Sequence, residues 1–229
     1  MKTSNKLLIA ATLMVIGSIV AFDFSLRAEY LKRDYKKRFY NKNQLSLKDF
    51  DAIEDNTANF TDLTVEQGPE FGVWIDDYDA KDDLIFTIDH RTLHIDYKKE
   101  RKINNKYSIN IICPNLKSIV TRYKSLTALV ERGGVTTVSG FKQDTMNVKV
   151  NNATLLALTD NNITLLNATV NSGILTITQN NTINTGNFDL KADAQFNMLN
   201  TDIKNARYKH ENNAALNLSG KPLELLLKQ

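Results

Sequence analysis

A repeat with a period near 20 residues, running from Met146 to Leu218, constrains the fold of this chain more than any other feature. A spacing of two residues, which recurs within the repeat, puts both side chains on one face of a β-strand. Asparagine, serine and glycine fill the segments between these positions, and such residues favour turns. The apolar positions form three tracks: Val148 and Val150, Ala168 and Val170, Phe188 and Leu190; Leu156 and Leu158, Leu175 and Ile177, Ala194 and Phe196, Leu216 and Leu218; Ile163, Ile183 and Ile203.

Three short strands and three turns in every 20 residues describe one coil of a parallel β-helix, with about six coils over residues 110–229. Stacked coils together bury an inner face that one coil cannot bury alone. A leucine-rich repeat has a similar period, but its return segment, residues 164–170 here, favours strand over helix. An antiparallel sandwich of short strands is the third candidate, and it requires no fixed period. We expect the β-helix and keep the other two open.

The tracks are expected to face the core, and the asparagines are expected to stack at solvated turns. Replacing Ile183 by Asp should therefore destabilise the fold strongly, because an unpaired carboxylate would be buried. Replacing Asn181 by Asp should do much less.

The N-terminal end contains an apolar run from Leu7 to Phe22, which Phe24 and Leu26 can extend toward the length of about 20 residues that a membrane-spanning helix needs. A signal peptide would end in a small-x-small cleavage site, and the candidates here are poor. We expect an uncleaved signal anchor at residues 1–27, with a cleaved signal peptide as the alternative. A basic juxtamembrane linker is expected at residues 28–47, and the β-helix head domain at residues 48–229.

The charge distribution leaves the membrane orientation open. Six basic residues follow the apolar run, which by the positive-inside rule favours a cytoplasmic domain, although long exported domains translocate despite such charge. Residues 1–42 hold 9 of the 29 basic and 3 of the 26 acidic residues, so the remainder has 20 basic and 23 acidic residues. The folded part therefore has no basic excess suited to nucleic acid. The six bases are Arg27, Lys32, Arg33, Lys36, Lys37 and Arg38.

Short strand signals fill the middle of the chain, and no convincing helix pattern follows residue 40. The alternation in Leu93-His94-Ile95-Asp96-Tyr97 predicts a strand with one buried and one wet face. The single Cys113 excludes an intrachain disulfide and is expected to be a buried, inert thiol. The expected strands are Phe50–Ile53, Leu63–Glu66, Phe71–Ile75, Leu84–Ile88, Leu93–Tyr97 and Ile109–Ile112.

A family resemblance lies in the order of these segments. The chain reads Phe50-x-x-Ile53, Leu63-x-Val65-Glu66-Gln67-Gly68, Val73-x-Ile75, Thr92-Leu93-x-Ile95 and Ile109-x-Ile111-x-x-Pro114-x-Leu116-x-x-Ile119, followed by the repeat. Over about residues 48–220 it resembles the bacterial auto-transporter adhesin head domain, often called the GIN domain. The resemblance implies a right-handed β-helix outside the cytoplasm and transfers no catalytic residue. The glycine-serine turns of such domains are reduced here to Gly133-Gly134 and Ser139-Gly140.

Candidate chemical groups are sparse. The acidic segment Asp76, Asp77, Asp79, Asp82 and Asp83 lacks the glycine bend and closing glutamate of a calcium loop. His90 and His94 have no evident third metal ligand, and His210 lies far along the chain. The acids of the repeat, Asp144, Asp160, Asp189, Asp193, Asp202 and Glu211, form no ladder of the paired carboxylates that glycoside hydrolysis needs. Tyr107, Tyr123 and Tyr208 could stack on sugars, but nothing places them together.

The sequence therefore names no catalytic, cofactor-binding or metal residue, and no cofactor is expected. We expect a noncatalytic, membrane-anchored envelope protein for adhesion or for binding a glycan or protein ligand, with its β domain in the periplasm. The alternatives are a carbohydrate-active enzyme on the same scaffold and a structural or assembly protein.

Overall fold

The computed structural model describes residues 3–32, 38–76, 83–98, 106–123, 133–178, 180–211 and 213–228. The chain divides into two compact units, Met1–Asn41 and Lys42–Gln229. The domain boundaries expected at residues 27 and 47 stay a prediction.

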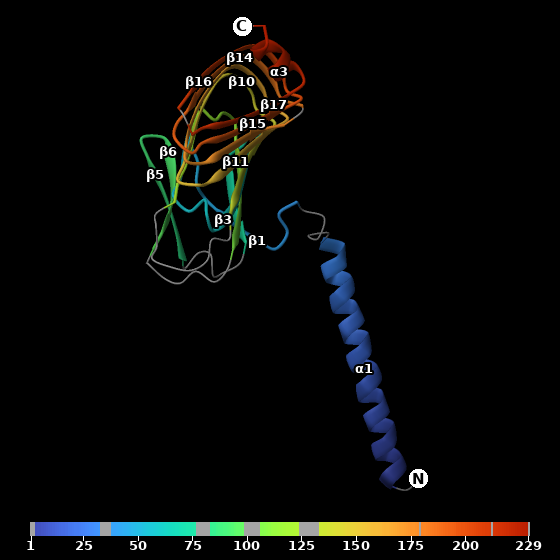
Figure 1. The fold of residues 1–229 in the computed structure, drawn as a ribbon. Helices are drawn as coiled ribbons and strands as arrows, with labels where there is room; N and C mark the ends of the chain where they lie inside the picture. The colour runs from blue at the N-terminus through green and yellow to red at the C-terminus, as the bar shows by residue number, and fades with distance from the viewer. Residues whose placement is uncertain are drawn as a thin grey trace. The chain divides into compact units, whose positions relative to one another are not determined.

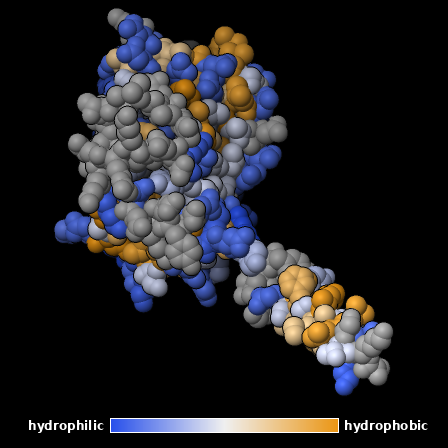
Figure 2. Space-filling model, turned by 90° about the horizontal axis from the view of Figure 1, so that it is seen from below, coloured by the Kyte–Doolittle hydropathy of each residue, from blue (hydrophilic) through white to orange (hydrophobic). Residues whose placement is uncertain are grey.

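Among its described residues, the first unit contains one helix, α1 (Thr3–Lys32). Its segment Asn5–Leu31 is long and apolar enough to cross a membrane, a test that a signal sequence also passes. Apolar side chains such as Leu8, Met14 and Phe24 are exposed along it. Figure 2 shows hydrophobic surface, in orange, on this helix. The expected bases Arg33, Lys36 and Lys37 lie outside the described residues.

The described residues of the second unit are mostly β-strands, with a short helix near the C-terminal end. Its strands begin with β1 (Lys42–Leu45), β2 (Ala52–Asp55), β3 (Thr61–Gln67), β4 (Gly72–Asp76), β5 (Leu84–Asp89), β6 (Thr92–Tyr97), β7 (Tyr107–Cys113) and β8 (Ser118–Thr121). They continue with β9 (Val135–Ser139), β10 (Lys142–Asn151), β11 (Leu155–Thr159), β12 (Asn162–Asn171), β13 (Ile174–Ile177), β14 (Thr182–Leu190), β15 (Gln195–Leu199), β16 (Asp202–His210) and β17 (Ala215–Ser219), and α3 (Lys221–Leu226) follows.

Two mixed sheets share these strands (Figure 1). Within the described residues, the first sheet has nine strands in the order β1-β4-β7-β3-β9-β11-β13-β15-β17. The second has eight, in the order β16-β14-β12-β10-β8-β2-β6-β5. One continuous hydrophobic core draws its residues from both sheets. Strands such as β7 contribute every second side chain to it, because successive side chains of a strand point to opposite faces.

The expected right-handed parallel β-helix is wrong. Three pairings in the second unit are antiparallel: β1 with β4, β4 with β7, and β5 with β6. The strand order also departs from the chain order, since β3 lies between β7 and β9, and β2 lies between β6 and β8. The molecule is therefore a pair of mixed sheets and not a solenoid. The six coils expected over residues 110–229 are wrong for the same reason. The expected strands of the middle region are present, with ends within two residues of the prediction.

The 20-residue period is visible in the register of the later strands. Val148 pairs with Ala168 and Ala168 with Phe188, and Ile163, Ile183 and Ile203 are in line. Each repeat contains two strands and not the expected three, because the first and third tracks merge into one long strand such as β12. The second track is misaligned at its third member: Leu175 and Leu216 both pair with Phe196 and not with Ala194.

Helix α3 packs against β16 and β17, the last strands of their respective sheets. Pro222 is buried at its start, and Leu225 packs against the core. Gly220 precedes it with a φ of 67°, a left-handed conformation that glycine adopts without strain. The helix thus covers the side of the C-terminal strands that faces no further strand.

Candidate functional site

Three charged residues meet where parallel strands of the second sheet begin. Asp51, Arg91 and Lys117 stand one residue before β2, β6 and β8. The register pairs Ala52 with Thr92 and with Ser118, so the three preceding residues fall side by side. Their proximity follows from the strand order β8-β2-β6 and from nothing local in the sequence.

Asp51 forms ion pairs with both neighbours. Its Oδ2 lies 2.8 Å from Lys117 Nζ and 3.1 Å from Arg91 Nε. The carboxylate is largely buried, whereas the two cations are mostly exposed. Burial alone raises the pKa of Asp51, but the hydrogen bonds and charges of Lys117 and Arg91 outweigh it and hold the pKa below the usual value. Asp51 is therefore ionised, and it holds in place two cations that remain exposed to solvent.

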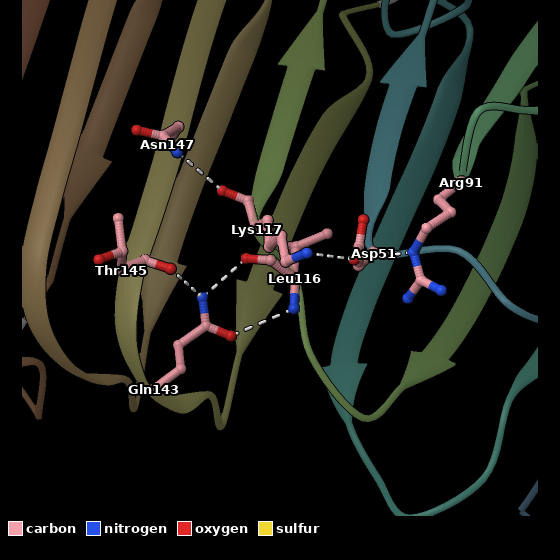
Figure 3. Close-up of polar contacts among 7 residues, drawn as sticks. All are labelled: Asp51, Arg91, Leu116, Lys117, Gln143, Thr145 and Asn147. Atoms are coloured by element: carbon pink, nitrogen blue, oxygen red, sulfur yellow. Dashed lines mark hydrogen bonds and ion pairs between the residues drawn. The ribbon is translucent and has the colours of Figure 1, made fainter.

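Gln143, on β10, forms another wall of this site. Figure 3 shows its polar contacts. Its Oε1 accepts a hydrogen bond from Leu116 N at 3.1 Å, and its Nε2 donates to Leu116 O at 2.7 Å and Thr145 O at 2.8 Å. Asn147 Nδ2 donates to Lys117 O at 3.1 Å. These bonds tie β10, which extends past the beginning of β8, to the segment that carries Lys117.

A groove of about 490 Å³ lies between these walls. Phe50 and Phe71 supply apolar surface and contact each other with ring centroids 5.1 Å apart. Phe50 is fully buried, so Phe71 is the aromatic ring that a ligand can reach. The remaining lining is mostly polar and includes Asn115, Asp144, Thr145 and Asn147. An open groove with one accessible ring, amides and two cations suits a small polar ligand.

A strained turn places Arg91. His90 and Arg91 form the two-residue loop between β5 and β6, with φ values of 44° and 64°. Positive φ at both central positions defines a type I′ turn, in which Asn-Gly is preferred. Arg91 O accepts a hydrogen bond from Asp51 N at 3.0 Å, so the loop is fixed to the residue that its guanidinium pairs with.

The structure does not bring together the tyrosines that the sequence suggested for sugar stacking. Tyr107 is in the core, with its hydroxyl on Asp83. Tyr208 stacks on Phe188 at 5.3 Å with its hydroxyl buried, and burial raises its pKa to about 12. Tyr123 makes an isolated bridge to Thr57. None of the three lines the groove at Asp51.

The histidines and cysteine lie apart from the groove's polar lining. His90 pairs with Asp89 at 2.8 Å and is exposed, while His94 lies 3.8 Å from Glu54. Cys113 is buried as expected, and burial raises its pKa to about 12. Among the residues that the structure describes, no three His, Cys, Asp or Glu side chains gather as metal ligands.

The acidic residues singled out in the sequence also do not gather at one site among the described residues. Asp76 forms an ion pair with Lys42 at 2.9 Å, whereas Asp77, Asp79 and Asp82 lie outside the described residues. Of the acids in the repeat, only Asp144 lines the groove at Asp51, and Asp189 lines a second, shallower hollow. No sequence pattern pointed to Asp51, Arg91, Lys117 or Gln143 as site residues. The available signal was their shared position before or at the beginning of a strand.

Several solved structures match this chain, among them the following three. A crystal structure described as a "putative adhesin" from Parabacteroides merdae has a TM-score of 0.50 at 13% identity, covering 76% of this chain and 79% of that one. A second, described likewise, from Parabacteroides distasonis, has a TM-score of 0.49 at 15% identity, covering 76% and 79%. A "putative lipid binding protein" from Parabacteroides distasonis has a TM-score of 0.41 at 14% identity, covering 79% and 94%.

At these identities the likeness to the Parabacteroides merdae structure shows a related fold and nothing finer. No family model matches the chain, and no curated protein matches it.

Proposed function

We propose that this chain is a noncatalytic binding module, tethered to a bacterial membrane by α1, whose groove at Asp51 holds a saccharide group. The observation that carries the proposal is the groove itself, where one accessible ring, two cations and several amides surround about 490 Å³. Sugars are bound by such combinations, because hydroxyl groups both donate and accept hydrogen bonds and the ring face packs on an aromatic side chain.

Membership of the adhesin head family is part of the proposal. The quoted motifs support it, and so does the fold shared with the Parabacteroides merdae protein, which is described as a "putative adhesin". Under this proposal α1 stays uncleaved in the inner membrane and the second unit faces the periplasm, where it meets envelope glycans.

A glycosidase is the competing function, because both Asp51 and Asp144 line the groove. Glycoside hydrolysis needs one carboxyl group that holds a proton near neutral pH. Asp51 is unsuited to that role, since its two cation partners lower its pKa. This electrostatic arrangement supports binding without turnover.

The test uses the full-length chain in neutral detergent against a panel of envelope and plant glycans, with affinity measured by calorimetry. Arg91→Gln should weaken glycan binding at least tenfold, because it removes a groove cation while Asp51 keeps Lys117. Arg122→Gln is the matched control: Arg122 is also an exposed arginine in an ion pair, with Glu54 at 2.8 Å, but it lies after β8, at the other end of that strand. New reducing ends would establish the enzyme instead. Equal affinity in both variants would contradict the groove.

A further inference from the structure

Side chains on the outer face of the second sheet form two straight rows across four parallel strands. The register aligns Asn147, Asn167, Asn187 and Arg207 in one row, and Lys149, Thr169, Asp189 and Lys209 in the next. Both rows face away from the core, because the residues between them on the first three strands, Val148, Ala168 and Phe188, are buried. Three strand spacings of about 4.8 Å make each row roughly 14 Å long.

The asparagine row is connected by hydrogen bonds. Asn187 Nδ2 donates to Asn167 Oδ1 at 2.9 Å, and Asn167 Nδ2 donates to Asn147 Oδ1 at 3.0 Å. Asn147 in turn lines the groove at Asp51. The chain of amides therefore leads from that groove across the sheet to Arg207. Each amide in it keeps hydrogen-bonding capacity beyond these bonds.

A shallow hollow of about 310 Å³ lies along the rows on β12, β14 and β16. Phe188 and Tyr208 border it, but Phe188 is buried and the half-buried ring of Tyr208 stacks on it, so the hollow offers mainly amide, hydroxyl and charged groups. Single-stranded nucleic acid is bound largely by successive bases stacking on several aromatic side chains, and a surface with one half-buried ring suits it poorly.

The charges beside the hollow are mostly positive. Asp189 is paired with Lys191 at 3.1 Å, and Lys191 also lies 3.5 Å from Glu211. Lys149, Arg207 and Lys209 are exposed and form no ion pair among the residues that the structure describes. These three cations exceed the single negative charge that remains on the Asp189, Lys191 and Glu211 cluster. The strip therefore complements an anionic ligand.

We infer that this amide and cation strip, defined by the two rows, binds an extended acidic glycan that carries carboxylate groups and lies across the strands. The amides bind sugar hydroxyl groups, and Lys149, Arg207 and Lys209 bind carboxylates. The rows repeat at every strand, so a polymer of repeating units fits them better than a single compact ligand does. The inference rests on the proposed function, because the groove at Asp51 would hold one part of the same glycan.

The experiment measures affinity of the full-length protein in neutral detergent for galacturonic acid oligomers of increasing length, at low and high salt. We expect affinity to increase with length until the oligomer spans the strip, and to fall with salt because the cations are exposed. Arg207→Ala with Lys209→Ala should weaken binding of long oligomers at least tenfold and leave short ones unchanged. Lys48→Ala with Lys228→Ala removes two exposed lysines elsewhere and is the control; thermal melts confirm that both variants fold.

Three outcomes would overturn the inference. Affinity independent of length, together with equal binding by the Arg207/Lys209 and control variants, would show that the strip takes no part. In that case a loss caused by Arg91→Gln would still support the groove. Equal binding of neutral glucose oligomers would remove the acidic specificity, and tighter binding of a thymidine oligonucleotide or of anionic vesicles would assign the strip to another class of partner.

Discussion

Asn161 and Asn181, one repeat apart, are joined by a buried hydrogen bond: Asn161 Nδ2 donates to Asn181 Oδ1 at 3.0 Å. Asn181 Oδ1 also accepts from Asn161 N at 3.1 Å, and its Nδ2 donates to Leu158 O at 2.8 Å and Thr178 O at 2.7 Å. The amide therefore satisfies backbone groups that the turn would otherwise leave buried without partners. The expectation that Asn181 lies at a solvated turn is wrong, since it is 2% exposed.

Asn181→Asp should consequently destabilise the fold by about 2 kcal/mol or more, since the new carboxylate cannot donate to the two carbonyl groups. The neighbouring Asn162→Asp is the control, because Asn162 is exposed at the beginning of β12. Denaturant unfolding measures both free energies. Equal values for the two variants would contradict the role of the buried amide.

A buried carboxyl group should make stability depend on pH. Asp55 Oδ1 accepts hydrogen bonds from Thr57 N at 2.8 Å and Thr57 Oγ1 at 2.7 Å, while its Oδ2 is buried without a hydrogen bond among the described residues. Burial raises the pKa of Asp55 from 3.8 to about 6, despite the hydrogen bonds of Thr57 and Thr61, which lower it. The folded protein thus keeps this proton over a pH range in which the unfolded chain releases it.

The contribution of Asp55 to stability is complete below about pH 4 and is lost as the pH rises toward 6, by an amount on the order of 3 kcal/mol. Asp55→Asn should flatten the free energy of unfolding over this range. Asp160→Asn is the control, because Asp160 is exposed. Urea melts from pH 4 to pH 7 give the comparison, and an unchanged slope in Asp55→Asn would refute the assignment.

A substitution in the turn that carries Arg91 should increase the stability of the protein. A left-handed backbone disfavours residues other than glycine by about 1 kcal/mol, so His90→Gly should stabilise the protein by roughly that amount. Arg91 keeps its ion pair with Asp51 in this variant, and glycan affinity should be unchanged. Thermal melts and calorimetry test both statements. A loss of stability would mean that the His90–Asp89 pair outweighs the backbone strain.

The orientation of the second unit can be tested with thiol chemistry. Cys113 is buried and its pKa is raised, so the folded protein should react slowly with maleimide and serve as a silent background. We expect Lys228→Cys, at an exposed position, to be labelled by an impermeant maleimide once the outer membrane is opened. Labelling only after lysis of the inner membrane would place the unit in the cytoplasm.

The sequence predicted most of the strands and which side chains face inward, because alternation and the 20-residue period are direct consequences of strand geometry. Ile163, Ile183 and Ile203 illustrate this, being buried and in register. Alternation does not encode which strand pairs with which, so the insertion of β3 between β7 and β9 was not predictable from it.

The groove was missed for the same reason. Asp51, Arg91 and Lys117 are separated by 40 and 26 positions along the chain and share only their place before a strand. Their meeting depends on long-range pairing of β2 with β6 and β8. Asn181 was misassigned because the sequence pattern of a turn asparagine is the same whether its amide bonds to water or to buried backbone carbonyls.

Helix α3 has a consequence for solubility. Strands β16 and β17 end their sheets, and an uncovered edge strand offers free N–H and C=O groups to any other chain. In this protein β16 and β17 each pair in parallel with one neighbour only, β14 and β15 respectively, among the described residues. Helix α3 packs against both strands, and the Lys221–Asp202 ion pair holds its first turn in place. We therefore expect α3 to hinder end-to-end polymerisation.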